Sequence, residues 1–439
     1  MSPSFESRLR ECLSETPFLQ RLPVVAAPFL ERRAKDAAAR ALEGPNLNGL
    51  ARVLASNSAA ARYLSHRPGL LERIAEASPE GLRAHAAELE IAGPPQQDDL
   101  EGFLDGLRLT RRDATVLAAC LDLGGSLSFE ETSRFLSILA EACVRWALQM
   151  AEAQESTATS AVISVLGMGK VAGRELTYHS DLDLIFLYPD DVTEVVQPSR
   201  TAQRLIHYLS TMTGAGVAYA VDSRLRPSGR QGTLISTYQA FDRYQRERAA
   251  TWEHLALMRA RAIAGDIVRA QQLLDHVREA VLAQHTSPWP EVAEMRQRVE
   301  QGLGRESNGS IALKTGAGGL MDVDFLAAGG LLERRVPPTS GALPSIPWML
   351  TAIADGPGME QLLEDYRFLR RVMARTRWVA GRAEDTLKLD GENIDAIAEL
   401  VEPGLSPEAL AGRLAAARSA IRSSYERVIA AGTIGALRS

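Results

Sequence analysis

The chain has 439 residues, enough for about two to four domains or one large helical assembly. Hydrophobic residues make up 46% of it and charged residues 24%, as in ordinary globular proteins. The formal net charge of −6 argues against nucleic acid or an anionic membrane as a partner, because both attract basic surfaces. Cys12, Cys120 and Cys143 lack metal-ligand spacing and are too few for a disulfide framework, which favours a reducing compartment.

We expect neither a leader peptide nor a membrane anchor. Residues 1–15 mix acidic and basic side chains without an apolar core, unlike a secretory signal. No apolar run approaches the roughly 18 residues that a transmembrane helix requires. Together with the cysteine content, these features predict a cytoplasmic protein without a membrane partner.

Residues 1–95 are predicted to form an N-terminal arm of short helices. Interruptions are expected at Asn57 and Pro68, and the AGPPQQDD stretch at 92–99 is typical of a linker. Apolar residues recur at helical spacing between these breaks: Leu50, Val53, Leu54, Leu70, Leu71 and Ile74.

A long helix is predicted over 128–153. Ser128 and Glu131 have the spacing of a capping box at its start. One apolar stripe then follows, which we interpret as core rather than as a cofactor surface: Phe135, Leu139, Cys143, Trp146 and Met150.

Strands are predicted only in the middle of the chain. Apolar or β-branched runs indicate strands at 161–167, 182–188, 217–225 and 233–236, with a helix over about 198–212. From 238 onward the pattern is helical, with interruptions at 311–325 and 337–347, and the last helix begins with Ser406 as N-cap and Pro407 after it.

The resulting fold class is α+β and mostly helical. A small α/β core with a mixed sheet is expected between the N-terminal arm and a C-terminal helical bundle. The predicted domains are 1–95, 96–266 and 267–439.

The first motif, GMGKVAGREL at 167–176, follows a strand and opens a short helix. Glycines there would let the backbone approach a phosphate. Gly167, Gly169 and Ala172 also match the dinucleotide fingerprint, but the next strand begins too soon for a crossover helix, so we reject that interpretation. A Walker A loop is absent because Lys170 is followed by valine.

The second motif is Asp181-Leu182-Asp183, at the start of a predicted strand. Two acids at i and i+2 on a strand share a face, and a divalent cation would relieve their repulsion. Mg²⁺ favours a few carboxylates combined with substrate phosphates. A solvated strand start is the simpler alternative, since Asp-x-Asp is common.

The third motif places Asp222, Arg224 and Arg226 on one face of a predicted strand. The three could form an ion-pair ladder, or a third metal ligand with two guanidinium groups for a triphosphate. In the second case Ser228 and Gly229 would carry the chain over the nucleotide.

The order of the three motifs is more specific than any one of them. A glycine turn, an Asp-x-Asp pair and a later strand with a single Asp suit two-metal phosphoryl or nucleotidyl transfer. That chemistry needs no protein nucleophile, in agreement with the lack of any Ser/His/Asp or Cys/His grouping.

Residues 167–188, GMGKVAGRELTYHSDLDLIFLY, resemble the signature of glutamine synthetase adenylyltransferases, a family of the nucleotidyltransferase superfamily. Residues 221–234 and 251–266 resemble its next two motifs, and residues 313–325 resemble a motif of its helical domain. The similarity extends over about residues 47–436.

The resemblance implies a set of site residues. Asp181 and Asp183 would be paired Mg²⁺ ligands and Asp222 the third carboxylate, and all three would be catalytic. The nucleotide-binding residues would be Gly169, Lys170, Gly173, Ser180, Arg224, Arg226 and Lys314. A helix behind the site would carry Trp252, Glu253, His254 and Arg259, with Trp252 packing rather than touching adenine. Gly318, Gly319 and Asp322 would belong to the helical domain that closes over the nucleotide.

The resemblance also implies an activity. Family enzymes usually join two such halves, of which one transfers AMP from ATP to a tyrosine of glutamine synthetase and the other removes it by phosphorolysis. Ser228 and the TWEH segment at 251–254 favour the attaching half here. Mg²⁺, ATP, glutamine synthetase and a PII-type signalling protein or separate partner half are therefore expected.

Two alternatives remain open: the phosphorolytic half, which would release ADP, and a nucleotide-binding regulatory module without turnover. The length of the chain, which has room for one half only, and departures from the family pattern at Ala312, Asp324 and Ala328 motivate the second. Ala172 also departs from that pattern. These departures leave the three aspartates intact.

Overall fold

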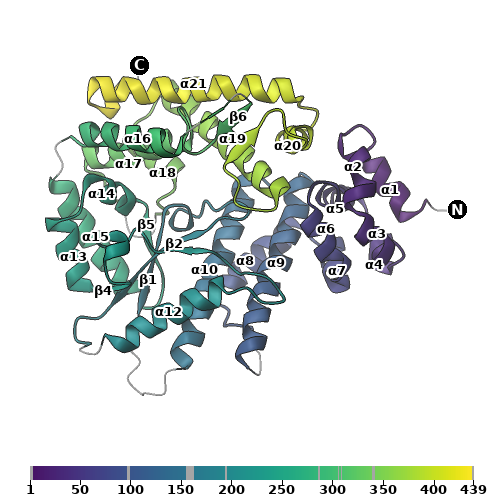
Figure 1. The fold of residues 1–439 in the computed structure, drawn as a ribbon, viewed down its shortest axis with the longest axis horizontal. Helices are drawn as coiled ribbons and strands as arrows, with labels where there is room; N and C mark the ends of the chain where they lie inside the picture. Colours follow the sequence, from purple (N-terminus) through teal and green to yellow (C-terminus); the bar gives the residue numbers. More distant parts are fainter. Residues whose placement is uncertain are drawn as a thin grey trace.

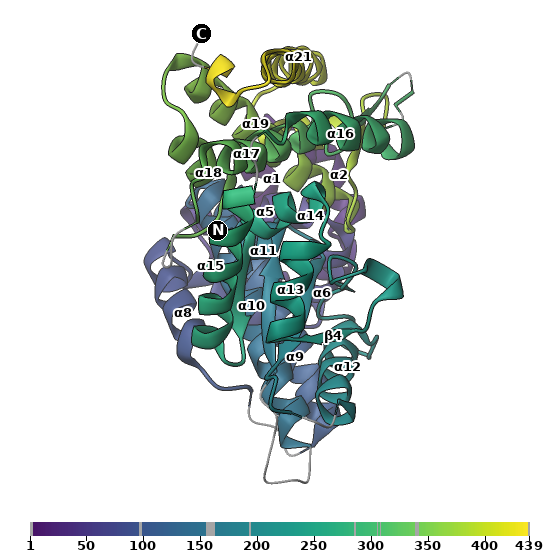
Figure 2. The ribbon, with the colours of Figure 1, turned by 90° about the vertical axis from the view of Figure 1, so that its left-hand side faces the viewer.

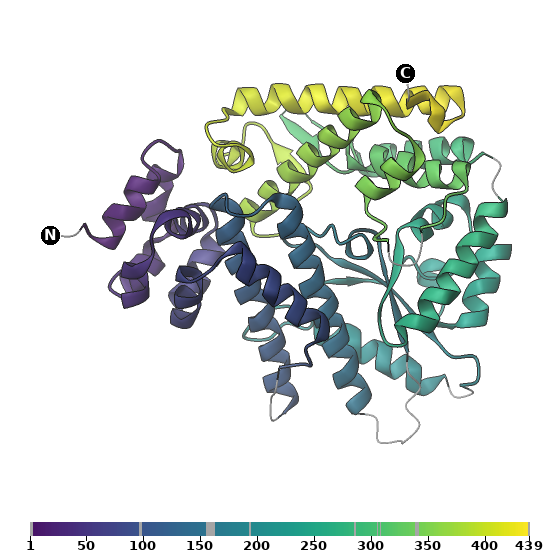
Figure 3. The same cartoon turned by 180° about the vertical axis from the view of Figure 1, so that it is seen from behind.

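The computed structural model describes residues 3–95, 99–154, 163–192, 195–284, 287–304, 306–307, 309–338 and 342–437. Short N-terminal helices lie at one end of the molecule, the sheet lies further in, and a helical bundle lies above the sheet (Figure 1). The last long helix runs across this bundle, as the reverse view also shows (Figure 3). The mostly helical α+β class is confirmed.

The arm is helical, as predicted. Its helices are α1 (Phe5–Cys12), α2 (Phe18–Val25), α3 (Ala27–Arg33), α4 (Ala37–Ala41), α5 (Gly44–Ser56), α6 (Ser58–Ser65), α7 (Pro68–Ala75) and α8 (Pro79–Ile91). Both predicted breaks are confirmed, since Asn57 caps α6 and Pro68 begins α7. Of the predicted linker, residues 96–98 lie outside the described residues.

Two long helices connect the arm to the sheet, α9 (Leu100–Leu123) and α10 (Phe129–Ala153). The capping box of α10 is confirmed, because Ser128 accepts from the Glu131 backbone and Glu131 accepts in return. The predicted stripe is core: four of its members are buried and Met150 packs against them.

The sheet is mixed. Its strands are β1 (Ser164–Met168), β2 (Leu182–Tyr188), β3 (Val221–Asp222), β4 (Ile235–Thr237) and β5 (Ala260–Ala264). β1 lies antiparallel between β2 and β5, while β3 and β4 pair parallel with the two ends of β2. β1 and β2 are antiparallel, whereas a dinucleotide-binding βαβ unit joins parallel strands, so the rejection of that interpretation is confirmed.

Two strand predictions need correction. The strand expected over 217–225 is only Val221–Asp222, because the Arg224 N–H donates to Asp222 Oδ1 at 2.9 Å and turns the chain. Arg226 therefore does not share a strand face with Asp222. In the segment expected to be helical from 238 onward, residues 260–264 form β5 instead. Residues 161–162 of the first predicted strand lie outside the described residues.

Short and medium helices surround the sheet. They are α11 (Gly169–Ala172), α12 (Val196–Ser210), the 3₁₀ turn Gly229–Gln231, α13 (Tyr238–Glu247), α14 (Thr251–Met258) and α15 (Ile267–Gln284). The helix predicted over 198–212 is confirmed as α12, shifted by two residues. The turn at Gly229 follows Ser228, whose φ of 60° is left-handed.

The bundle contains α16 (Trp289–Leu303), α17 (Leu320–Arg334), α18 (Ile346–Ile353), α19 (Pro357–Ala380), α20 (Ile394–Val401), α21 (Pro407–Ala431) and a 3₁₀ turn at Ile434–Leu437. β6 (Ser310–Ala312) and β7 (Thr386–Lys388) form a small antiparallel pair. The interruption predicted over 311–325 is too long, since α17 already begins at Leu320. The Ser406 cap of α21 is confirmed.

Both faces of the sheet are buried. Val165, Leu184 and Phe186 belong to a core shared with the arm, α9 and α10, whereas Leu166 and Ile185 belong to a core shared with α13–α15 and the bundle. The side view shows the bundle stacked above the sheet and its helices (Figure 2). Within the described chain, no helix has both the length and the apolar character that a membrane span needs.

Candidate functional site

Two of the predicted carboxylates lie side by side at one end of the sheet. β2 and β3 pair in parallel with Asp183 opposite Asp222, and the Leu182 N–H donates to the Ala220 carbonyl at 2.9 Å. Asp181 stands one residue before β2 and is exposed. β2 is otherwise buried along its whole length, so Asp183 is a polar group on an apolar strand.

The pKa of Asp183 shows that this placement is costly for a charge. Burial, followed by the nearby charges of Asp181 and Asp222, raises the pKa of Asp183 to about 6. Lys314 and Lys170 act in the opposite direction, so both cations stand within electrostatic range of the carboxylate. An incoming cation would relieve the same repulsion.

Asp222 forms an ion pair with Arg224, two residues further along the chain. The Arg224 Nε donates to both carboxylate oxygens of Asp222, at 2.9 and 2.7 Å, and Nη2 donates to Oδ2 as well. Among the described residues, no three His, Cys, Asp or Glu side chains stand close enough together to hold an ion. Asp181, Asp183 and Asp222 offer carboxylate oxygens, which are the donors that Mg²⁺ prefers, but as they stand they are not close enough together to hold it. Binding would require the three to come closer and Asp222 to leave Arg224. The Arg224 side chain is 62% exposed, so water can take over its hydrogen bonds.

Gly169 and Gly173 of the glycine motif contribute close approach, since their own N–H groups are already bonded. Gly169 has a φ of +59°, and a Cβ built there would lie 3.8 Å from Asp183 Oδ2. Its N–H donates to the Arg259 carbonyl at 2.7 Å, and the Gly173 N–H donates to Gly169 at 3.1 Å. A Cβ on Gly173 would come within 3.0 Å of the Pro344 carbonyl oxygen, so this glycine lets the bundle approach.

Lys170 is one of two cations in the motif, with Arg174. Burial, followed by the charges of Arg377 and Lys314, lowers the pKa of Lys170 to about 7. Lys314 comes from the loop after β6, so the bundle contributes a second lysine to the surroundings of Asp183. Two lysines beside three carboxylates suit a ligand that carries both metal and phosphate.

Glu175, which the sequence prediction did not single out, joins the motif to the bundle. Its Oε2 accepts from Arg259 at 2.6 Å and from the Ile346 N–H at 3.0 Å. Its Oε1 accepts from Tyr366 at 3.0 Å and from Arg370 at 3.2 Å. All of these side chains are buried, so Glu175 fixes the bundle against the motif.

Arg259 continues this connection. It follows the last residue of α14 and does not lie on that helix, which corrects the prediction. Its Nη1 donates to Asp324 Oδ1 at 2.8 Å, so the aspartate at this departure from the family pattern still reaches an arginine.

Ser180 is placed inside the protein. It is buried, and its hydroxyl lies 3.1 Å from the Thr177 backbone N and 3.2 Å from Arg377 Nη1. Arg377 in turn donates to Asp385 at 2.9 Å. Arg377 and Asp385 are further residues that the sequence did not indicate, since both lie about 200 positions after the motif.

Of the remaining predicted residues, one lies in the turn after β3 and the others lie in the bundle. Arg226 donates to the Ser223 carbonyl at 2.7 Å and braces the turn after β3. Asp322 is fully buried and accepts from Gly318 at 2.9 Å and from Arg296, which makes it a structural residue of the bundle. Gly318 itself has a φ of +69° and lies against Arg418.

The predicted helix behind the site is α14. Glu253 accepts from the Ala250 N–H at 2.9 Å and so caps it, while His254 Nε2 lies 2.8 Å from the Gln245 carbonyl oxygen. Trp252 is 36% exposed and is therefore less buried than the packing role predicted for it.

Comparison with known proteins decides the family. A profile of the family described as glutamate-ammonia ligase adenylyltransferase matches residues 47–276, more than half of the chain. The chain belongs to this family. Residues 291–429 match a second profile, described as GlnD PII-uridylyltransferase, so the bundle carries its own similarity.

Individual relatives agree with this assignment. Three proteins named bifunctional glutamine synthetase adenylyltransferase/adenylyl-removing enzyme are similar to the chain. The one from Xanthomonas campestris pv. campestris is 36% identical over 300 residues, 64% of this chain and 32% of that protein. The one from Vibrio parahaemolyticus is 35% identical over 307 residues, 63% of this chain and 32% of that protein. The one from Xanthomonas axonopodis pv. citri is 34% identical over 376 residues, 81% of this chain and 37% of that protein. The chain thus spans about a third of the length of these adenylyltransferase-family relatives.

Proposed function

We propose that the chain is a nucleotidyltransferase half that transfers AMP from ATP to a tyrosine of glutamine synthetase. The pairing of Asp183 with Asp222 on neighbouring strands, beside Asp181, carries the proposal. The acceptor comes from the names of the relatives, which describe enzymes that adenylylate glutamine synthetase.

In this reaction the tyrosine oxygen bonds to the α-phosphorus of ATP, the bond from that phosphorus to the β-phosphate oxygen breaks, and pyrophosphate leaves. The hydroxyl proton passes to solvent. Asp181, Asp183 and Asp222 would hold Mg²⁺, which supplies charge neutralisation for the triphosphate and activates the hydroxyl.

The other residues of the site would bind and orient the nucleotide. Lys170 and Lys314 lie within electrostatic range of Asp183 and would attract phosphate oxygens. Arg224, once released from Asp222, offers a planar pair of donors that matches a phosphate. Gly169 leaves room beside Asp183 because it has no side chain.

The test is the intact mass of the cognate glutamine synthetase subunit after incubation with this protein, ATP and Mg²⁺. We expect a gain of one AMP, and no gain with Asp183→Asn. An AMP gain that a folded Asp183→Asn variant also produces would contradict the assignment of the aspartates.

Phosphorolytic removal of AMP is the second candidate, because the names of the relatives include both activities and the family profile does not separate them. There phosphate oxygen would attack the phosphorus of adenylyl-tyrosine, releasing ADP and free tyrosine. Loss of AMP from modified glutamine synthetase, dependent on added phosphate, would favour it. ATP binding without either reaction would favour a regulatory module that works with a PII-type protein or a separate partner half.

A further inference from the structure

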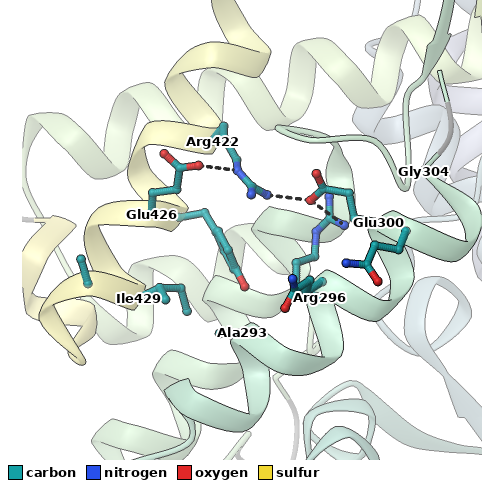
Figure 4. Close-up of a pocket in the computed structure, with 11 residues that line it drawn as sticks. Ala293, Arg296, Glu300, Gly304, Arg422, Glu426 and Ile429 are labelled. Atoms are coloured by element: carbon teal, nitrogen blue, oxygen red, sulfur yellow. Dashed lines mark hydrogen bonds and ion pairs between the residues drawn. The ribbon is translucent and has the colours of Figure 1, made fainter. Parts of the chain in front are cut away.

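Two cavities of nearly equal volume lie away from the aspartates, and their charges differ. The first, about 650 Å³, lies between α16 and α21 (Figure 4). Arg422 donates there to Glu300 at 3.0 Å and to Glu426 at 2.8 Å, so the acids and bases at its rim satisfy each other. Such a lining has no charge left over to attract an ion.

The second cavity, about 660 Å³, lies where the core meets the bundle. Its lining combines residues of α10, the glycine motif, β5, α15 and the segment that leads into α18. Among the described residues that line it there is no aspartate or glutamate, whereas four are arginines: Arg134, Arg174, Arg261 and Arg278. We call it the junction cavity.

Two of these arginines have donors to spare. Arg134 is exposed, and no hydrogen bond or ion pair is found for it in the described parts of the chain. Arg261 donates through Nε to the Ala172 carbonyl at 3.0 Å and through Nη2 to Glu141, which leaves Nη1 without a partner there. Their unused N–H groups are the strongest donors for an oxyanion.

The other two arginines add charge that their partners do not cancel. Arg174 shares the buried carboxylate of Glu141 with Arg261, so one acid faces two guanidinium groups. Glu90 reaches Arg174 at 2.6 Å from outside and is 42% exposed. Arg278 is buried and donates to the carbonyls of Leu257 and Ala260, with its nearest acid 3.5 Å away. The four arginines therefore carry more charge than the acids that pair with them, and the cavity is positive.

Part of the lining is apolar and includes an aromatic ring. Leu343, Pro344 and the partly exposed Trp348 belong to it. The volume exceeds what a phosphate ion alone would fill, and an indole offers a flat surface for a planar group.

We propose that the junction cavity binds a small organic phosphate with a planar apolar group. Its phosphate pairs with Arg134 and Arg261, and its planar part lies beside Trp348. The site uses none of the three aspartates and therefore needs no divalent cation. Because Arg174 and the Ala172 carbonyl belong to the glycine motif, an occupant would contact both that motif and the bundle.

The test is calorimetric titration of the full chain with phenyl phosphate in EDTA. We expect saturable binding by the wild type, weakened roughly tenfold in Arg134→Gln, which removes charge-assisted hydrogen bonds. Arg62→Gln, an exposed arginine on α6 outside the cavity, is the matched control and should bind like the wild type. Asp183→Asn should also bind normally, which separates this site from the candidate catalytic centre.

Other outcomes would overturn the proposal. These are equal affinity in Arg134→Gln with preserved circular dichroism, inorganic phosphate binding as tightly as phenyl phosphate, and an acidic peptide displacing phenyl phosphate at lower concentration. Trp348→Phe provides a second readout, because phenyl phosphate should change the tryptophan fluorescence of the wild type and not of this variant.

Discussion

Replacing Asp183 by asparagine should make the metal-free protein more stable at neutral pH while abolishing nucleotidyl transfer. Burial and the charges of Asp181 and Asp222 raise the pKa of Asp183 from 3.8 to about 6, so the ionised carboxylate destabilises the folded state. A difference of about two pKa units corresponds to about 3 kcal/mol, which we reduce to about 1–3 kcal/mol because the side chain is partly exposed. The variant removes the charge and keeps the shape.

The pH dependence gives the sign of the effect. Above about pH 6 the folded wild type carries the full cost of the charge, and as the pH falls from 6 towards 3.8 the cost disappears because the folded carboxyl takes up its proton first. Urea unfolding in EDTA at pH 7.5 and pH 4.5 measures this. We expect the variant to be more stable at pH 7.5 and the difference to shrink at pH 4.5.

Asp191→Asn, at an exposed aspartate beyond the other end of β2, is the matched control and should change little. An Asp183→Asn variant that is less stable than the wild type at pH 7.5 would refute the reasoning, since it would mean that the carboxylate stabilises the fold.

Three further predictions concern the framework of the site. Glu175→Gln should lower the free energy of unfolding by about 3–5 kcal/mol in urea titrations, because it leaves Arg259 and Arg370 buried without the carboxylate that they share. A change below about 1 kcal/mol would show that Glu175 does not hold the bundle. Gly318→Ala should lower the free energy of unfolding by about 2 kcal/mol or more, since the φ of Gly318 is +69° and a Cβ there would lie 2.0 Å from the Arg418 carbonyl oxygen. Gly404→Ala, at a φ of +79° with open space around it, should lower it less. Equal losses in the two variants would contradict the steric argument. Ser128→Ala should cost about 1 kcal/mol in thermal or urea unfolding by removing the α10 cap, and an unchanged midpoint would count against it.

Local sequence patterns predict the elements whose conformation is determined by residues close together in the sequence. β2 follows the predicted run from Leu182 to Tyr188 without a shift, because a strand buried on both faces is apolar at nearly every position, here all but Asp183. The cap of α10 depends on two residues three positions apart, so it too could be predicted. β5 could not, since the alanines of Ala260–Ala264 carry little strand preference and only pairing with β1 makes the segment a strand.

The sequence singles out the three aspartates of the candidate site, whose role stays a prediction, but not the residues that hold the surrounding segments in place. Asp181, Asp183 and Asp222 stand out through the order of the three motifs, since Asp-x-Asp alone is common. Asp222 turns to Arg224 because a short polar side chain at a strand end can bond the backbone two residues on, which strand alternation ignores. Glu175 is bonded to Arg370, 195 positions away, and a lone acid gives no sign of such a partner.

The most direct test of the central claim is metal binding by the three aspartates, measured without turnover. Mn²⁺ can replace Mg²⁺ at oxygen ligands, and its bound fraction can be followed by electron paramagnetic resonance with a non-hydrolysable ATP analogue present. We predict that the wild type binds Mn²⁺ together with the analogue, that Asp183→Asn and Asp222→Asn lose most of this binding, and that Asp191→Asn keeps it. Equal Mn²⁺ binding by all four proteins would contradict the account.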